Sequence, residues 1–179
     1  MMKITMVLGS PRSNSISTQL AMRFADGAKE AGHDVSIYNI NEMDIMGCQA
    51  CGCCRKYDTD CVIDDDMEGY FKELRESGAL VITSPNYYSQ IAGPMITFMN
   101  RHYCLLDKDR NPRLEDRKKL FAFFAQGAPE GNEKYISNYE WYTEIFTTKN
   151  MELVKLLTAG GNSDMDSLLT EAYEAGKKL

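Results

Sequence analysis

The chain has 179 residues, and its 20 Lys and Arg residues against 26 Asp and Glu residues give a formal net charge of −6 at pH 7. Hydrophobic residues make up 44% of the chain and charged residues 26%, which are values of a globular protein and exclude a disordered or collagen-like chain. The acidic balance argues against a nucleic-acid partner. We therefore expect one folded domain over residues 1–179.

The first third of the chain alternates between apolar runs and polar loops. Residues 3–8 predict a strand that ends at Gly9, and apolar positions at helical spacing predict a helix over residues 15–31. Residues 34–40 predict a second strand because they include β-branched and aromatic side chains. A Cys-rich loop, defined here as residues 46–63, follows this strand.

The middle of the chain predicts two helices around one strand. The acidic run Asp64–Asp66 precedes a helix expected over residues 67–76, and carboxylates are favourable at the positive end of a helix. Residues 79–83 form a continuous apolar run typical of a strand buried on both faces, and Ser84-Pro85 is expected to stop it. A second helix is expected from Pro94 to about Cys104.

The last third of the chain predicts two more strands. A polar, charged excursion over residues 105–119, of which 108–119 is expected to be a solvated loop, leads to a strand over residues 120–125. Residues 132–147 predict a helix, residues 151–158 the fifth strand, and residues 163–178 contain the terminal helix. Strands that alternate with helices predict an α/β fold of three layers with a parallel sheet in the middle.

No secretory or membrane segment is expected. Residues 1–11 lack the apolar core and cleavage site of a signal peptide, and the uncharged stretch Ser77–Asn100 is broken by Ser84-Pro85 and Gly93-Pro94. We therefore expect a cytoplasmic protein in a reducing compartment, without a membrane span.

Three loops at the carboxyl ends of the expected strands have compositions suited to ligand binding. Because ligands of parallel α/β sheets bind outside these ends, the loops Gly9–Thr18, Ser84–Gly93 and Gln126–Asn132 should converge on one site. The first loop places five hydroxyls, an amide and a guanidinium before a helix N-terminus, which suits a phosphate group. Ordinary capping of the helix by Ser and Asn is the alternative explanation.

The second loop contains two aromatic residues, Tyr87 and Tyr88, directly after a buried strand. Aromatic side chains offer a stacking surface to a flat heteroaromatic ring, and backbone groups can hydrogen-bond its polar edge. A Tyr-rich surface turn is the alternative explanation.

Four segments together carry a resemblance to one protein family. In chain order they are Gly9-Ser10-Pro11-Arg12, Cys48-Gln49-Ala50-Cys51-Gly52-Cys53-Cys54, Cys61-Val62-Ile63-Asp64-Asp65-Asp66-Met67 and Ser84-Pro85-Asn86-Tyr87-Tyr88. They resemble the flavodoxin-like NAD(P)H-dependent FMN reductases, in particular their iron–sulfur flavoprotein branch. The resemblance covers nearly the whole chain and implies a flavodoxin-like three-layer sandwich with a five-stranded parallel sheet in the order 2-1-3-4-5. The family commonly has Asp-Arg where this chain has Asn100-Arg101.

The resemblance implies an enzyme that binds FMN and uses NAD(P)H to reduce quinones, flavins or other small acceptors. Because the chemistry takes place at N5 of the flavin, no catalytic side chain is required. A homodimer or homotetramer is also implied. The residues implied to hold the FMN phosphate are Ser10, Arg12, Asn14, Ser15 and Ser17, and those implied to border the isoalloxazine ring are Pro85, Asn86, Tyr87, Tyr88, Ser89, Gln126 and Gly127.

Five of the six cysteines lie in the Cys-rich loop, and Cys48, Cys51, Cys54 and Cys61 are spaced C-x2-C-x2-C-x6-C. Such spacing can place four thiolates around an iron–sulfur cluster, and it resembles the motif by which iron–sulfur flavoproteins hold a 4Fe-4S cluster. Cys53 is an extra thiol. A zinc site, disulfides formed in air and a loop without metal are the alternatives.

The remaining candidate residues favour structural roles. Cys104 lies on an amphipathic helix and is expected to be a buried thiol. His33 and His102 are well separated and do not have the spacing of metal ligands. Helix capping explains Asp64–Asp66 better than divalent-metal binding does.

Two other functions stay open from the sequence. A flavodoxin-like or iron–sulfur flavoprotein electron carrier would exchange electrons with redox-protein partners without nicotinamide turnover. A redox or metal sensor would use the Cys-rich loop for regulation. Turnover of NAD(P)H with an artificial acceptor distinguishes the enzyme from the carrier.

Overall fold

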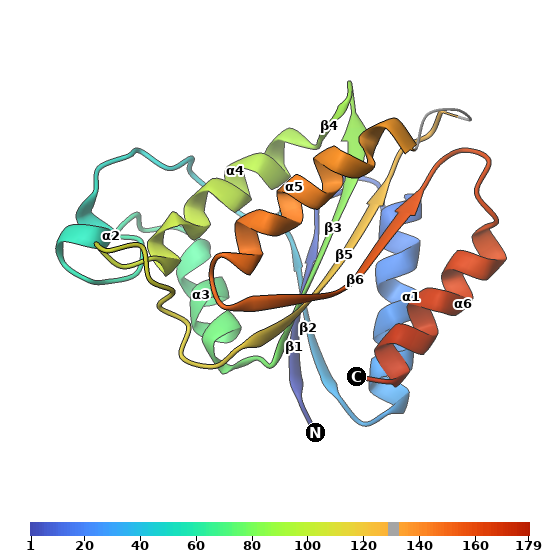
Figure 1. The fold of residues 1–179 in the computed structure, drawn as a ribbon, viewed down its shortest axis with the longest axis horizontal. Coiled ribbons are helices and arrows are strands. Elements are labelled where there is room, and N and C mark those ends of the chain that lie inside the picture. The colour runs from blue at the N-terminus through green and yellow to red at the C-terminus, as the bar shows by residue number, and fades with distance from the viewer. Residues whose placement is uncertain (129–132) are drawn as a thin grey trace.

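Five parallel strands form the middle layer of the fold (Figure 1). The strands of the computed structural model, which describes residues 1–128 and 133–179, are β1 (Lys3–Leu8), β2 (Asp34–Asn39), β3 (Ala79–Tyr87), β4 (Gln90–Ile91), β5 (Lys118–Ala125) and β6 (Met151–Ala159). They pair in the order β2-β1-β3-β5-β6, and the short β4 pairs antiparallel with the end of β3. Since the fourth and fifth predicted strands are β5 and β6, the predicted fold and strand order are confirmed.

Helices cover both faces of the sheet (Figure 1). One face packs against α1 and α6, and the other packs against α3, α4 and α5, so each face has its own apolar core. No helix in the described part of the chain is long and apolar enough to span a membrane. The helices are α1 (Ile16–Glu30), α2 (Cys53–Lys56), α3 (Met67–Glu76), α4 (Gly93–Arg101), α5 (Ile136–Thr147) and α6 (Met165–Lys177), with 3-10 turns η1 (His102–Leu105) and η2 (Glu133–Tyr135).

The central strand β3 is longer than the sequence predicts. The expected stop at Ser84-Pro85 is wrong because both residues still pair with β5, where Pro85 lies opposite Ala125. Beyond them, Asn86 and Tyr87 pair with β4. Proline lacks an amide donor, but at the end of a strand this loss is tolerated. The extension carries the second loop past the sheet edge.

Other element boundaries also differ from the predictions. The α-helix expected to reach Cys104 ends at Arg101 and continues as η1. The short helix α2 (Cys53–Lys56) lies inside the Cys-rich loop, where no helix was predicted. The predicted loop over residues 126–132 and the predicted helix start at residue 132 fall partly on residues 129–132, which lie outside the described residues.

Most of the segment 105–119 is solvated as its charge predicts, since residues 108–112 and 115–117 are exposed. Two of its side chains are exceptions: Leu114 is buried in the core, and Lys118 is buried while its ammonium donates to the Arg75 carbonyl oxygen at 2.8 Å. These two side chains anchor the segment to the core and to α3.

His102 has the structural role that the sequence predicts. The ring is fully buried; Nδ1 donates to the Phe98 carbonyl oxygen at 3.0 Å, so Nε2 accepts from the Tyr70 hydroxyl at 2.7 Å. Burial lowers the pKa of His102 to about 3. Cys104 is also buried, as expected, and burial raises the pKa of its thiol to about 12. Neither side chain is available as a ligand.

We expect the free energy of unfolding to fall as the pH drops below about 6.5. The His102 pKa is about 3 in the folded chain but near the ordinary histidine value of 6.5 after unfolding, so the unfolded state binds more protons between these two values. The stability that the neutral His102 ring contributes is complete above pH 6.5. As the pH falls towards 3, the free energy of unfolding decreases by up to ~1.4 kcal/mol per pH unit. Urea denaturation of the unmodified chain and of His102→Leu between pH 7 and 4 measures the effect. Equal pH slopes for the two chains would contradict it.

Candidate functional site

Loops from the ends of three adjacent strands line one cavity of about 320 Å³, called here the strand-end cavity. Gly9 allows the first loop to pass close to β3, because a Cβ at this position would lie 2.5 Å from the Thr83 carbonyl oxygen. The convergence predicted for the three loops is thus present in the described residues. The lining residues are Arg12, Asn14, Ser15, Ile16, Ser17, Pro85, Asn86, Tyr87, Ala125, Gln126 and Gly127.

The first loop is shaped by its own hydroxyl groups. The Ser15 hydroxyl caps α1, accepting from the Thr18 amide at 3.2 Å and donating to the Thr18 hydroxyl at 2.8 Å. Ser10 is buried beneath the loop, where its Oγ accepts from the Arg12 amide at 3.2 Å. The capping explanation therefore holds for Ser15, while Arg12 and Asn14 remain exposed at the cavity wall.

The second loop is a two-residue hairpin between β3 and β4. Tyr88 and Ser89 have φ angles of 51° and 69°, the left-handed conformation that such tight turns require. Tyr88 points into solvent and is fully exposed, and the Ser89 hydroxyl lies 3.2 Å from the Tyr135 hydroxyl. Asn86 is held at the cavity by a 3.0 Å hydrogen bond from Nδ2 to the Tyr139 hydroxyl.

The third loop closes the opposite side of the strand-end cavity. The Gln126 side chain folds back on the loop, with Nε2 donating to the Ala128 carbonyl oxygen and Oε1 accepting from the Ala128 amide, both at 2.7 Å. The structure thus brings Arg12, Asn14, Ser15, Ser17, Pro85, Asn86, Tyr87, Gln126 and Gly127 to one cavity. It does not bring Ser10, Tyr88 or Ser89 to its wall.

The four regularly spaced cysteines line a second cavity of about 670 Å³, called here the Cys cavity. Cys48 and Cys51 are exposed, Cys61 is half-buried and Cys54 is buried. Cys53 is not part of the lining. The other lining residues are Gln49, Ala50, Gly52, Arg55, Lys56, Val62, Ile63, Asn100, Tyr103 and Lys108.

The thiols of the Cys cavity differ in their electrostatic environment. Hydrogen bonds from the Cys53 backbone and side chain lower the pKa of Cys51, and burial raises the pKa of Cys54. Within residues 1–128 and 133–179, no group of three or more His, Cys, Asp or Glu side chains is arranged to hold a metal ion. The four cysteines share a cavity but are not a preformed single-ion site.

A buried ion pair closes the two ends of the Cys-rich loop. Arg101 at the end of α4 pairs with Asp65, and both side chains are only 1% exposed. Arg101 Nη1 also donates to the Met46 carbonyl oxygen at 2.7 Å, while the Asp65 carboxylate accepts from the Met46 and Met67 amides at 3.0 Å. The predicted capping of α3 is thus present only at Asp65, which accepts from the first helical amide, whereas the N-cap residue Asp66 makes no side-chain cap bond and accepts from the Asp44 amide at 2.7 Å.

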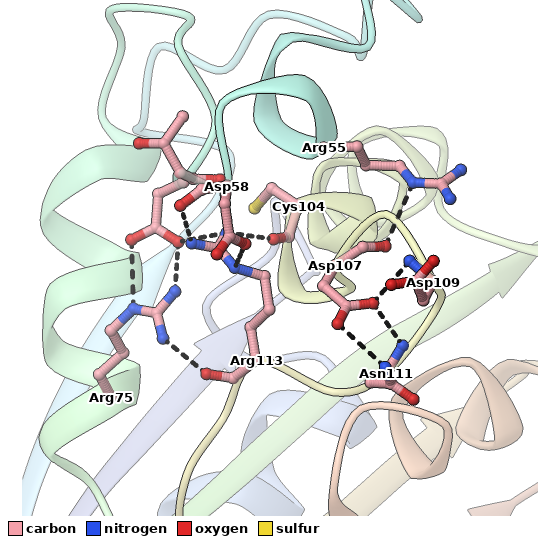
Figure 2. Close-up of polar contacts among 10 residues, drawn as sticks. Arg55, Asp58, Arg75, Cys104, Asp107, Asp109, Asn111 and Arg113 are labelled. Carbon is pink, nitrogen blue, oxygen red and sulfur yellow. Dashed lines mark hydrogen bonds and ion pairs between the residues drawn. The ribbon is translucent and has the colours of Figure 1, made fainter.

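Arg113 fixes the far side of the Cys-rich loop (Figure 2). Its guanidinium donates to the Asp58 and Cys104 carbonyl oxygens, both at 2.8 Å, and to the Thr59 carbonyl oxygen. Arg75 of α3 pairs with the Asp60 carboxylate beside it. One side chain from the 105–119 segment thus holds three backbone groups in place.

Arg55 makes a second link between the Cys-rich loop and the 105–119 segment (Figure 2). Nε donates to the Asp107 carbonyl oxygen at 3.2 Å, Nη1 donates to the Tyr103 hydroxyl at 2.6 Å, and Nη2 donates to the Lys108 carbonyl oxygen. No role was predicted for Arg55, Arg101 or Arg113. Apart from Cys104, which lies 9 residues from Arg113, their partners lie 36 to 55 residues away, so no local spacing could have indicated them.

Comparison with known proteins identifies relatives of this chain. The model of the family described as NADPH-dependent FMN reductase matches residues 2–135. An iron-sulfur flavoprotein of Methanosarcina thermophila is 27% identical over 165 residues, which are 90% of this chain and 79% of that protein. The chain spans between 61% and 66% of three further relatives with the same description.

Solved structures with the same fold align with 99% or more of this chain. An azoreductase from Bacillus anthracis aligns with a TM-score of 0.76 at 15% identity over 100% of both chains. An NAD(P)H:quinone oxidoreductase from Methanothermobacter marburgensis aligns with a TM-score of 0.74 at 15% identity, over 99% of this chain and 95% of that one. At this level of identity the likeness shows the fold alone.

We expect Arg113→Gln to loosen the Cys-rich loop without unfolding the sheet. Hydrogen bonds from a charged group contribute about 1.5–3 kcal/mol each, so amide exchange over residues 53–61 should accelerate about 10- to 100-fold. Hydrogen–deuterium exchange followed by mass spectrometry measures this, with the Thr59 amide, which donates to the Cys54 carbonyl oxygen at 3.0 Å, as the reporter.

Arg110→Gln is the matched control for Arg113→Gln. Arg110 lies in the same segment and is exposed, and the 53–61 amides should keep their protection when it is replaced. Equal exchange in the two variants would contradict the role given to Arg113.

Proposed function

The chain belongs to the NADPH-dependent FMN reductase family, in its iron–sulfur flavoprotein branch, and from this premise we propose that it is an FMN-dependent NAD(P)H oxidoreductase. Its acceptors are quinones, free flavins or other small molecules. One observation carries the proposal: three loops whose compositions suit a phosphate and a flat ring line a single cavity at the carboxyl ends of β1, β3 and β5.

The first loop is the proposed phosphate site. Arg12 offers a positive charge, Asn14 an amide and Ser17 a hydroxyl, and the first amides of α1 have no partner within the helix. These donors and the positive end of the helix favour a dianionic phosphate. Ser10 and Ser15 support them by fixing the shape of the loop.

The second and third loops are the proposed site of the isoalloxazine ring. Pro85, Asn86 and Tyr87 line one side of the cavity and Gln126 and Gly127 the other. The side chains of Asn86 and Gln126 are already fixed by hydrogen bonds, so the ring would meet a preorganised wall. Tyr88 and Ser89 at the hairpin tip are proposed to border the ring from outside the cavity.

The chain itself does not need to supply an acid, a base or a nucleophile. FMN, when bound, supplies acceptance of a hydride from NAD(P)H and storage of its two electrons. The side chains around the strand-end cavity bind the phosphate, orient the ring and leave one side open to solvent. An electron carrier without nicotinamide turnover is the alternative function, and the experiment below distinguishes the two.

We propose that Cys48, Cys51, Cys54 and Cys61 hold a 4Fe-4S cluster. Their ligand spacing, their shared cavity and the iron-sulfur flavoprotein description of the relatives support the proposal. Within the described residues no group is already arranged to hold a metal ion, so the proposal rests on the spacing, the cavity and the relatives.

We also propose that residues 1–179 form one domain, that the protein is located in the cytoplasm, and that it assembles as a homodimer or homotetramer.

We expect anaerobically purified protein with bound FMN to lose its flavin absorbance when NADH or NADPH is added, and to recover it with a quinone. Arg12→Ala should weaken FMN binding about tenfold, because a hydrogen bond to a charged phosphate is lost. Flavin fluorescence quenching measures the affinity. Arg23→Ala is the control, since Arg23 lies on α1 but pairs with Asp26 away from the cavity.

Two outcomes of this experiment would contradict the proposal. Flavin absorbance that neither nicotinamide bleaches, but that a redox protein does, would favour the electron carrier. Equal FMN affinity of the two arginine variants would remove the first loop as the phosphate site.

We expect Cys54→Ser to lose bound iron and sulfide, whereas Cys53→Ser keeps both. Cys54 lines the Cys cavity and its neighbour Cys53 does not, so the pair separates a ligand from an adjacent thiol. Iron and sulfide analysis after anaerobic reconstitution measures the difference. Stoichiometric zinc, or equal iron in the two variants, would contradict the cluster.

A further inference from the structure

Tyr139 of α5 lies behind the strand-end cavity without lining it. Its side chain is fully buried, and its ring stacks on Phe124 of β5 with 5.0 Å between the ring centroids and 27° between the ring planes. This packing fixes the position of the hydroxyl. A buried tyrosine hydroxyl needs a hydrogen-bond partner, so the identity of the partner decides what Tyr139 does.

The partner is the side chain of Asn86 at the end of β3. Asn86 Nδ2 donates to the Tyr139 hydroxyl at 3.0 Å, and the backbone of Asn86 pairs with Ile91 of β4. Main chain and side chain are therefore both held, although Asn86 is only half-buried and lines the cavity. A residue that does not reach the cavity thus orients one that does.

This hydrogen bond sets which end of the Asn86 amide is left for a ligand. A carboxamide has N–H donors on its nitrogen and an acceptor on its oxygen. The nitrogen is turned towards Tyr139, so Oδ1 lies on the other side of the amide, and no donor within the described residues reaches it. Oδ1 therefore has accepting capacity that the chain does not use.

Gln126 is the other carboxamide beside the proposed ring site, and its own loop occupies both of its ends. Nε2 donates to the Ala128 carbonyl oxygen and Oε1 accepts from the Ala128 amide, both at 2.7 Å. Of the two side chains, Asn86 is therefore the better acceptor for a bound ring.

Resting on the proposed FMN site, we infer that Asn86 Oδ1 accepts a hydrogen bond from N3–H of the oxidised isoalloxazine ring, and that Tyr139 is the positioning residue that turns Oδ1 towards the cavity. N3–H is the one N–H group of the oxidised ring, whose other polar edge atoms are acceptors. An acceptor that is fixed before the ligand arrives loses little freedom on binding. Without the Tyr139 hydroxyl the amide can turn its nitrogen to the cavity, which sets a donor against N3–H.

The test compares FMN with 3-methyl-FMN, which carries a methyl group in place of the N3 hydrogen. Flavin fluorescence quenching gives the dissociation constant of each ligand, and the ratio of the two constants separates recognition at N3 from general damage to the site. We expect Asn86→Ala and Tyr139→Phe each to lower the preference for FMN about 3- to 10-fold, because one neutral hydrogen bond is lost. Tyr139→Phe keeps the ring that packs on Phe124 and opens no space at Asn86.

Tyr135→Phe is the matched control for Tyr139→Phe. The Tyr135 hydroxyl also contacts the second loop, but it lies 3.2 Å from the hydroxyl of Ser89, which is outside the cavity wall. The preference for FMN should stay that of the unmodified chain.

Asn86→Asp separates positioning by Tyr139 from a structural role. Both terminal atoms of a carboxylate are acceptors, so this side chain presents an acceptor to the cavity whichever way it is turned. When Asn86→Asp is present, Tyr139→Phe should therefore leave the preference for FMN unchanged. An equal loss in both backgrounds, or no loss in either, would overturn the positioning role.

Nuclear magnetic resonance of ¹⁵N-labelled FMN gives a readout that does not depend on affinity. A hydrogen bond slows the exchange of N3–H with water, so we expect a persistent ¹H–¹⁵N signal from oxidised FMN in the unmodified chain and in Tyr135→Phe. The signal should be lost in Tyr139→Phe and in Asn86→Ala.

The remaining outcomes separate this inference from the proposed function. Rapid N3–H exchange in the unmodified chain with FMN bound would overturn the inference, even if Tyr139→Phe failed to fold, and would leave reduction of FMN by NAD(P)H standing. A chain that binds no FMN would overturn the proposed FMN site, and this inference with it.

Discussion

The buried ion pair between Arg101 and Asp65 fixes the position of the Cys-rich loop. Leaving one charge of such a pair buried and unpaired costs about 3–5 kcal/mol, so the end of α4 and the start of α3 stay together. Met46, at the beginning of the loop, is hydrogen-bonded to both partners. The loop therefore leaves and returns at one point, and its cysteines are confined to the space between.

Two cavities arise from the same property of a parallel sheet. The loops after β1, β3 and β5 line the strand-end cavity, and the chain that leaves β2 runs into the Cys-rich loop. All four segments follow carboxyl ends of strands, where ligands of this architecture bind. They differ in how they are held: hydroxyl and amide groups shape the strand-end loops, whereas arginines hold the Cys-rich loop.

Most of the fold could be predicted because its cause is local. The strand over residues 3–8 and the helix over residues 67–76 end where the apolar pattern ends. The predicted end of the third strand was wrong because pairing with a neighbouring strand sets this boundary. Pro85 stays in β3 because it pairs with β5. The prediction also missed two anchors of the otherwise exposed 105–119 segment, because charge density alone does not show that Leu114 and Lys118 are buried.

The sequence by itself determined which loops follow the carboxyl ends of the strands and the spacing of Cys48, Cys51, Cys54 and Cys61. It also determined the family resemblance, which the comparisons confirm. Only the tertiary structure decided which of these cysteines share a cavity, that Cys53 lies outside it, and that Arg101 forms a buried ion pair with Asp65. The physical reason is distance along the chain. The spacing of residues along a loop indicates only which of them are neighbours in that loop. The partners of a buried cation lie far away in the sequence and come together only when the chain folds.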